Sequence, residues 1–182
     1  ELPREATNLV PDGKGHFNRA LLSHRTGRNL FEFITTAPVL LNQTYTVIHV
    51  RDGKEAPKTR VRLGKFFHEL RSDLALGAIV RRGETTFRLF APRAKHVRLF
   101  LCEKLEGMDA AFGYELDRRA EPGGGWHGVW EAHLDRNLHG WYYWYTISGP
   151  QDVFGYFQPG QRVLDPYAQA AAGRAGQDLV LD

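Results

Sequence analysis

Short segments that alternate polar and apolar residues recur throughout residues 76–147, and this rhythm constrains the fold more than any other feature. The segments 96–101, 126–134 and 141–147 are the clearest, because their alternate side chains would lie on one side of an extended chain. Turn-forming residues separate them, most plainly at Pro-Gly-Gly-Gly 122–125. Short strands at about ten- to fifteen-residue spacing favour a β-sandwich, and no long helical pattern interrupts the series.

The residues before position 76 predict a smaller β domain. Strands are expected over 30–34, 45–50 and 60–63, where aromatic and β-branched residues gather. A weak pattern suggests a short helix over 16–23, and 66–74 reads as a short helix or linker. We therefore expect an all-β chain in three parts. These are a small, incomplete β domain and linker over 1–75, an immunoglobulin-like sandwich over 76–164, and a connector over 165–182.

Composition argues against several classes of function. The 24 Lys and Arg residues against 21 Asp and Glu give a net charge of +3 without a basic stripe, which disfavours a nucleic-acid partner. No stretch approaches the ~20 apolar residues of a membrane-spanning helix, so no membrane partner is expected. Cys102 is the only cysteine, which excludes an internal disulfide. Residues 1–4 lack signal-peptide features, which leaves a cytoplasmic and a secreted location both open.

No cofactor or metal is expected from the motifs. His127 and His133 would share a strand face but lie about 20 Å apart, too far for two ligands of one ion. His139 could approach His133 only across a turn. The glycine run at 123–125 is not followed by the lysine and helix of a phosphate-binding loop.

Four segments, in order, resemble the N-terminal, non-catalytic region of type I pullulanases and related debranching enzymes of the alpha-amylase superfamily. They are Leu-Gly-Ala at 76–78 with the strand ending Phe-Ala-Pro at 90–92, Gly-Val-Trp-Glu at 128–131, Leu-His-Gly-Trp-Tyr-Tyr-Trp-Tyr at 138–145, and Val-Leu-Asp-Pro-Tyr-Ala at 163–168. The resemblance implies a carbohydrate-binding-module-like sandwich attached to an α-1,6-glucan hydrolase, whose catalytic barrel would be the partner of this chain. A branching enzyme and a trehalose-forming relative are alternatives within the same superfamily.

No catalytic residue is predicted in this chain. Glycoside hydrolysis needs two carboxylates held across the bond, and the resemblance implies that they would lie on a barrel beginning after the Asp-Pro-Tyr-Ala phrase. The acids here are scattered; Glu115 and Asp117 would share a strand face, which we interpret as solvated. The connector over 165–182 is expected to dock toward the barrel and to be loosely ordered without it. Within the connector, Asp165 would cap or turn the chain through side-chain-to-backbone bonds, Pro166 would stiffen it and Tyr167 would pack.

Aromatic side chains are the candidate carbohydrate-binding residues, because sugar rings stack on exposed aromatic faces. Residues 141–145 offer two sets, one on each face of a strand. The resemblance places the tyrosine at position 143 inside, and with it Trp141 and Tyr145. Tyr142 and Trp144 would then face outward, and Trp126 would lie at a rim beside the glycine turn. These three residues, Trp126, Tyr142 and Trp144, are the predicted contacts for an α-glucan.

One departure from the family weakens the expected glycogen site. Glycogen-binding relatives carry a tryptophan after the strand that contains Val97 and another before the Asp-Pro phrase. Phenylalanine and tyrosine occupy both regions here, at 112, 114, 154, 156 and 157. Two alternatives therefore stand beside an accessory domain. One is a self-sufficient glucan-binding module, and the other is a fibronectin-type structural or adhesion sandwich, which would leave the Asp-Pro-Tyr-Ala exit unexplained.

Overall fold

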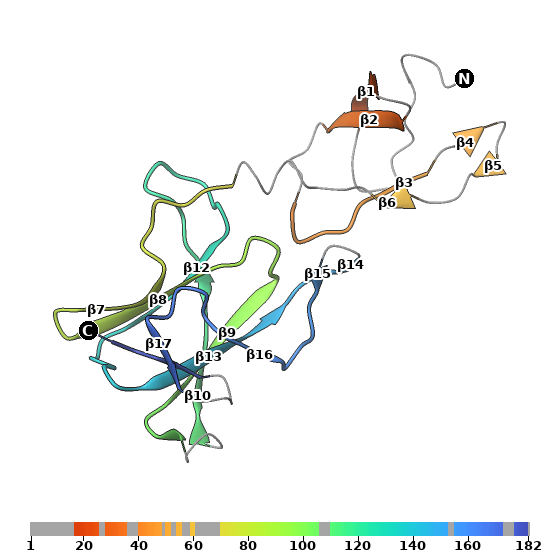
Figure 1. Ribbon diagram of the computed structural model, residues 1–182. Coiled ribbons are helices and arrows are strands. Elements are labelled where there is room, and N and C mark those ends of the chain that lie inside the picture. The colour runs from red at the N-terminus through yellow and green to blue at the C-terminus, as the bar shows by residue number, and fades with distance from the viewer. Residues whose placement is uncertain are drawn as a thin grey trace. The chain divides into compact units, whose positions relative to one another are not determined.

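The computed structural model describes residues 17–25, 28–35, 40–48, 50–51, 54–55, 59–60, 70–105, 110–152, 155–172 and 177–181 (Figure 1). The chain divides into two compact units, residues 1–40 and residues 41–182. The elements of the described residues are all β-strands, which confirms the all-β prediction. Within these ranges no helix is long and apolar enough to cross a membrane.

The first unit contains an antiparallel hairpin. Strand β1 (Phe17–Arg25) pairs with β2 (Arg28–Thr35), and the register runs from Phe17 opposite Thr35 to Arg25 opposite Arg28. The helix expected over 16–23 is therefore wrong, whereas the strand expected over 30–34 is confirmed. The aromatic and β-branched residues of β2 favour pairing, and the ladder takes up the backbone groups of β1 that a helix would otherwise have satisfied.

Four very short strands follow. β3 (Thr46–Val47) pairs with β6 (Thr59–Arg60), and β4 (Val50–Arg51) pairs with β5 (Lys54–Glu55). The continuous strand expected over 45–50 is thus divided between two separate ladders. Of the strand expected over 60–63, Arg60 is the last residue of β6, and residues 61–63 lie outside the described part of the chain. Residues 66–69 of the segment 66–74 also lie outside it, and the described residues 70–74 form no helix.

Two antiparallel sheets form the sandwich of the second unit. The four-stranded sheet has the order β11 (Asp117–Arg118), β12 (Val129–Leu134), β8 (Glu84–Phe90) and β7 (Gly77–Arg81). The other sheet has the order β10 (Phe112–Glu115), β9 (His96–Cys102), β13 (Tyr142–Ser148), β18 (Gln177–Leu179) and β17 (Ala170–Ala172), and β16 (Arg162–Val163) also pairs with β13. A separate small ladder joins β14 (Gln151–Asp152) to β15 (Gly155–Tyr156).

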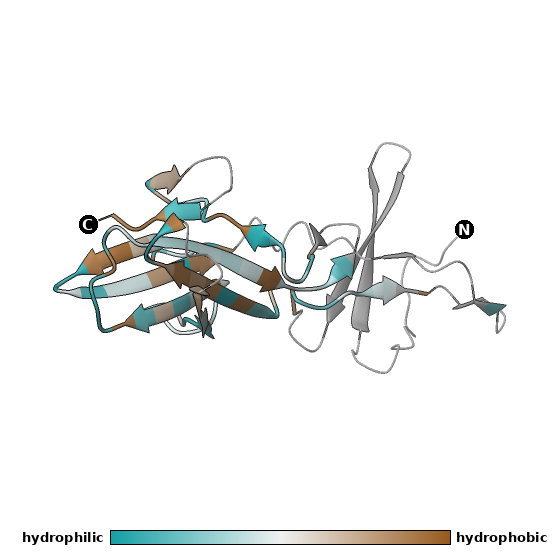
Figure 2. Ribbon diagram, turned by 90° about the horizontal axis from the view of Figure 1, so that it is seen from below, coloured by the Kyte–Doolittle hydropathy of each residue, from teal (hydrophilic) through white to brown (hydrophobic). Residues whose placement is uncertain are grey.

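The core lies between the inner faces of these sheets. Val97, Leu99 and Leu101 of β9 are at most 1% exposed, and they belong to the same buried cluster as Phe87 of β8. The Phe87 ring meets the Tyr143 ring of β13 edge-on, with centroids 5.2 Å apart. Hydrophobic and hydrophilic residues accordingly alternate along the sandwich strands (Figure 2). The structure confirms the immunoglobulin-like sandwich and the single face expected for alternate residues of 96–101, and it shows that this face is the inner one.

The chain crosses from one sheet to the other at Leu116. β10 ends at Glu115 in the six-stranded sheet, and β11 begins at Asp117 in the four-stranded sheet. Leu116 is 4% exposed, and its N–H donates to the Val97 carbonyl at 2.9 Å. This crossing leaves polar residues on either side of a buried leucine at the edge of the sandwich.

The C-terminal segment is part of the sandwich. β18 pairs with Tyr142 and Tyr143 of β13, and β17 extends the same sheet. Val180 is fully buried, and its N–H donates to the Trp141 carbonyl at 2.9 Å. The expectation of a loosely ordered connector over 165–182 is therefore wrong for its described residues. The edge of β13 offered unpaired backbone groups, and this segment satisfies them.

Candidate functional site

Strand β13 separates its aromatic residues onto the two faces of the sheet, as predicted. Tyr143 and Tyr145 are fully buried in the core, and Trp141 is half-buried against it. Tyr142 and Trp144 lie on the outer face. The outer-face residue Tyr142 is half-buried, opposite Cys102 of β9 and Leu179 of β18.

Trp144 belongs to a row of side chains across the outer face, which we call the aromatic row: Arg98, Phe100, Trp144 and Arg162. The Phe100 and Trp144 rings are nearly parallel, at 4°, with centroids 5.6 Å apart. The Arg162 guanidinium lies 4.8 Å from the Trp144 ring centre, and the Arg98 guanidinium lies 5.2 Å from that of Phe100. Each such cation–π contact contributes about 0.5–1 kcal/mol at an exposed site.

Trp144 faces outward as expected, but it is only 4% exposed, so its ring is not open to solvent. The outward direction was predicted from the alternation of β13, but the covering residues come from other strands. Arg162 of β16 is itself exposed. A sugar ring could therefore stack on Trp144 only if the Arg162 side chain moved away from it.

Trp126 lies in a different place, next to the four-stranded sheet. Its indole N–H donates to the Val129 carbonyl at 2.7 Å, and its ring meets the Trp130 ring edge-on, with centroids 5.9 Å apart. The Arg118 guanidinium lies 4.5 Å from the Trp126 ring centre. Trp126 and Trp144 are thus attached to different sheets, and each already has an arginine over its ring.

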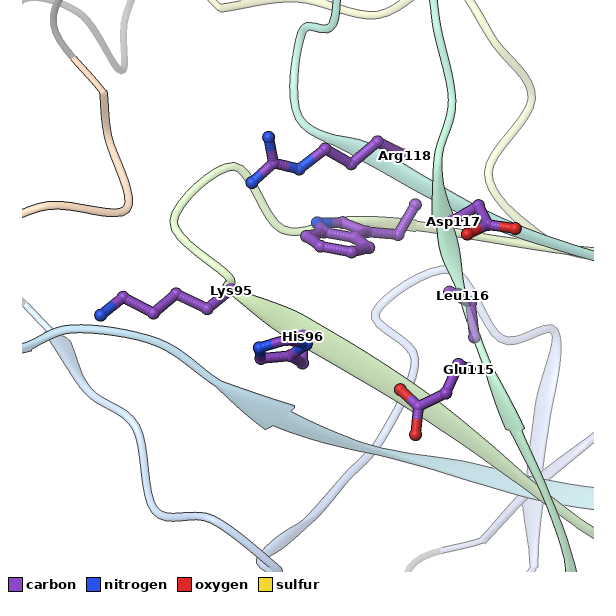
Figure 3. Close-up of a pocket in the computed structure, with 7 residues that line it drawn as sticks. Lys95, His96, Glu115, Leu116, Asp117 and Arg118 are labelled. Atoms are coloured by element: carbon purple, nitrogen blue, oxygen red, sulfur yellow. The ribbon is translucent and has the colours of Figure 1, made fainter.

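A pocket that the sequence did not predict opens at the edge where the chain crosses between the sheets (Figure 3). Its volume is about 690 Å³, and it is lined by Lys95, His96, Glu115, Leu116, Asp117, Arg118 and Trp130. The Arg118 guanidinium lies over the Trp130 indole, 5.5 Å from the ring centre. Acidic side chains (Glu115 and Asp117) and basic ones (Lys95 and Arg118) line the pocket beside the Trp130 indole. They offer hydrogen bonds to a polar ligand, but they do not form a prearranged nucleophile.

The alternation of residues 114–118 could not reveal this pocket. Glu115 and Asp117 were expected on one face of one strand, but they belong to strands of different sheets. Only the tertiary crossing at Leu116 brings them beside Trp130 and His96. A signal in the sequence was the single apolar residue between two acids, which is consistent with a strand that changes sheets.

The connector residues have two opposite environments. Asp165 is 4% exposed: its carboxylate accepts hydrogen bonds from the Tyr143 hydroxyl at 3.1 Å and from the Tyr167 N–H at 2.9 Å. Its own N–H donates to the carboxylate of Asp178, which is 1% exposed. Pro166 and Tyr167 are exposed, Tyr167 at 52%. Asp165 therefore anchors a turn that presents Pro166 and Tyr167 on the surface.

Sequence comparison identifies the sandwich. The sequence model of carbohydrate-binding module 48, the isoamylase N-terminal domain, matches residues 75–168, which is just over half of the chain. The chain belongs to this family. The matched region contains the four-stranded sheet, the strands β9, β10, β13 and β16, and the buried Asp165. No curated protein matches the chain.

Solved pullulanases have the same fold as this family member. A Klebsiella pneumoniae pullulanase complexed with maltotriose aligns with 90% of the chain at a TM-score of 0.71 and 19% identity, and Bacillus acidopullulyticus pullulanase aligns with 85% at 0.62 and 22%. The apo pullulanase of Paenibacillus barengoltzii aligns with 66% at 0.53 and 26%. The chain spans only 16%, 17% and 16% of these three structures.

The two buried carboxylates of this carbohydrate-binding module, Asp165 and Asp178, should make its stability depend on pH. Burial raises the pKa of Asp178 to about 6, the charge of Asp165 adds to the increase, and the hydrogen bond from the Asp165 N–H opposes it. Burial also raises the pKa of Asp165. An unfolded aspartate titrates near about 3.9, so the folded module binds the Asp178 proton more tightly than the unfolded chain does.

We expect the free energy of unfolding to fall as the pH rises from about 4 to about 6, by roughly 2 kcal/mol from Asp178. Asp178→Asn keeps an acceptor for the Asp165 N–H but has no charge, so it should be the more stable protein at pH 8 and should match the parent near pH 4. Urea unfolding of both proteins across this range measures the difference. A gap that widens toward acid pH would contradict the prediction.

Proposed function

We propose that this chain is an accessory region, on the N-terminal side, of an α-1,6-glucan debranching glycoside hydrolase of the pullulanase kind, and that it is not catalytic by itself. The observation that carries the proposal is the match to the isoamylase N-terminal family, together with the pullulanase fold over most of the chain. The ordered sequence motifs at 76–92, 128–131, 138–145 and 163–168, all within the matched region, agree with it. A fibronectin-type spacer would explain the sandwich but not these motifs.

The acids of the sandwich support a non-catalytic role. Retaining glycosidases place two carboxyl groups about 5–5.5 Å apart, with both facing the scissile bond. Asp165 and Asp178 are close together, but they are buried and satisfied by internal hydrogen bonds. Glu131 forms ion pairs with Arg88 and Arg119 on a strand surface. We expect no release of reducing sugar from pullulan by the purified 182-residue chain. Measurable release that a carboxylate substitution abolishes would contradict this prediction.

The exposed face of the Asp165 turn is the proposed contact with the catalytic barrel. Leu164 and Tyr167 are large hydrophobic residues that are 41% and 52% exposed, and they flank the buried Asp165 and the exposed Pro166. Apolar side chains held at the surface by a rigid turn suit a contact with another domain. Docking thus gives Asp165, Pro166 and Tyr167 a combined role, in which the first residue anchors and the others touch the partner.

The two candidate sugar-binding tryptophans are covered by other side chains, which favours the accessory role over a self-sufficient glucan-binding module. Trp144 is buried in the aromatic row, and Trp126 is half-buried with Arg118 over its ring. Neither ring presents an open platform to a sugar. In the proposed function these residues stiffen the module, and any α-glucan contact depends on the complete enzyme.

Titration with a cyclic maltodextrin of seven glucose units tests this choice, followed by tryptophan fluorescence and amide chemical shifts. We expect no saturable change up to ~10 mM, where a complex with a Kd near 1 mM would be about nine-tenths occupied. Saturable changes that disappear in Trp126→Ala or Trp144→Ala would instead support the self-sufficient binding module. Tyr142→Ala tests the third predicted contact, because Tyr142 shares the outer face with Trp144.

A further inference from the structure

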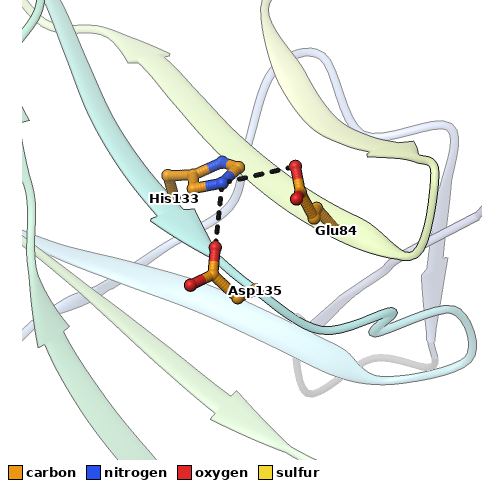
Figure 4. A group of neighbouring side chains, drawn as sticks. All are labelled: Glu84, His133 and Asp135. Atoms are coloured by element: carbon orange, nitrogen blue, oxygen red, sulfur yellow. Dashed lines mark ion pairs between the residues drawn. The ribbon is translucent and has the colours of Figure 1, made fainter.

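Three side chains that can bind a metal ion converge at one corner of the four-stranded sheet (Figure 4). His133 Nε2 lies 3.2 Å from a carboxylate oxygen of Asp135 and 3.5 Å from one of Glu84. One ligand atom from each of the three residues lies within 4.8 Å of the others. All three side chains are exposed, so an ion could reach them from solvent.

The strand register explains this convergence. His133 of β12 pairs with Thr86 of β8, and the two strands are antiparallel. Glu84 is two residues before Thr86, and Asp135 is two residues after His133, so all four side chains belong to one face of the sheet. The tight turn at Arg82 and Gly83, both with positive φ (53° and 83°), starts β8 at Glu84 and fixes its position.

Thr86 orients the imidazole. Its Oγ1 lies 3.0 Å from His133 Nδ1. When Nδ1–H donates to this hydroxyl, Nε2 carries the lone pair, and that lone pair faces the carboxylates of Glu84 and Asp135. Metal-binding histidines commonly use their second ring nitrogen in this way, because the hydrogen bond fixes the tautomer and the ring orientation.

The two distances from His133 Nε2 suit a tetrahedral ion, and the two carboxylate oxygens lie within 4.8 Å of each other. Zn²⁺ binds nitrogen and carboxylate oxygen at about 2.0–2.2 Å, so neighbouring ligand atoms of a tetrahedral site lie about 3.3 Å apart. The separations of 3.2 and 3.5 Å from Nε2 agree with that edge length. Two carboxylates balance the charge of a divalent ion, and an imidazole ligand favours zinc over magnesium or calcium.

We propose that Glu84, His133 and Asp135 bind a Zn²⁺ ion, with water at the fourth position. The site belongs to the chain itself and does not depend on the proposed glucan function. The bound ion would join the turn between β7 and β8 to the end of β12, and would tie one end of the four-stranded sheet together. Pairs of histidines were the only metal ligands considered from the sequence, so this group was missed. Its other two ligands are carboxylates, and one of them lies on the paired strand.

The test is calorimetric titration of the metal-free 182-residue chain with Zn²⁺, repeated with Co²⁺, whose visible absorption bands report tetrahedral coordination. We expect one saturable site that weakens at least about 10-fold in His133→Gln and in Asp135→Asn. Thr86→Val removes the orienting hydroxyl but no ligand, and should weaken binding by about 10-fold or more. The control is His139→Gln, which changes another exposed histidine and should leave the affinity unaltered.

Two results would overturn the proposal. One is the absence of saturable Zn²⁺ binding at 1:1 stoichiometry, which would mean that His133 only pairs with its two carboxylates when protonated. The other is binding that His133→Gln leaves unchanged, which would place the ion on other histidines. These outcomes are separable from folding, because His133, Glu84 and Asp135 are all exposed and urea unfolding of each variant reports its stability.

Discussion

Replacing Gly128 with alanine is expected to destabilise the module by about 3 kcal/mol or more, a large fraction of the about 5–15 kcal/mol that stabilises a typical domain. Gly128 has a φ of +106°, a conformation that residues with a Cβ rarely adopt. A Cβ built there would lie 2.7 Å from Pro92 Cβ and 3.0 Å from its Cα, and 3.2 Å from the Phe90 ring. Backbone strain costs about 1–3 kcal/mol, and overpacking a similar amount.

Gly124→Ala is the matched control for this prediction. Gly124 has a similar φ of +87°, but no atom lies within 4 Å of the Cβ it would gain. Its cost should therefore be the backbone strain alone, about 1 kcal/mol. Urea unfolding monitored by tryptophan fluorescence measures both variants. Equal losses for the two would show that the contact with Pro92 and Phe90 is not what requires glycine at position 128.

Asp165→Ala is expected to reduce the free energy of unfolding by about 3 kcal/mol. The substitution leaves the buried Tyr143 hydroxyl and the part-buried Tyr167 N–H without the carboxylate that accepts their hydrogen bonds. A fully buried unsatisfied group costs about 1–3 kcal/mol, and a part-buried one costs less. The removed side chain also leaves a space between β13 and the turn before β17. Denaturant unfolding at pH 7 provides the measurement.

Asp165→Asn separates the hydrogen bonds from the charge. The asparagine oxygen can accept from the Tyr167 N–H, and its NH2 group can donate to the Tyr143 hydroxyl, so both contacts persist with the second bond reversed. The substitution also removes a charge whose burial is unfavourable, as the raised pKa of Asp165 indicates. We expect it to lie within about 1 kcal/mol of the parent. If asparagine proved as damaging as alanine, the ionised carboxylate would be essential and the explanation by hydrogen bonds alone would be incorrect.

Much of the sandwich could be predicted because its strands are half-buried and their period is local. Val97, Leu99 and Leu101 occupy alternate positions, and that alternation alone placed them on one face of a strand. The hairpin of β1 and β2 shows the limit of the method. Residues 17–25 carry a weak pattern, and only pairing with β2 makes them a strand.

The candidate site was less predictable, because residues from distant segments bury Trp144, line the pocket and supply the proposed zinc ligands. The alternation of β13 correctly sent Trp144 outward, but its burial depends on Phe100 of β9 and Arg162 of β16. The pocket likewise depends on the sheet change at Leu116, and the proposed zinc ligands on the register of β8 against β12. None of these relations is contained in the period of a single strand.

The pairing of β13 has a consequence for where this module can be cut. One edge of β13 pairs with β9, and the other is shared by β16 and β18, which lie on either side of Asp165 along the chain. The family match ends at residue 168, before β18 begins. A protein shortened to that boundary would leave the backbone of Tyr142 and Tyr143 open as a sheet edge, a template for association between copies. A fragment that stays monomeric should therefore extend through Val180, whose burial closes that end of the sheet.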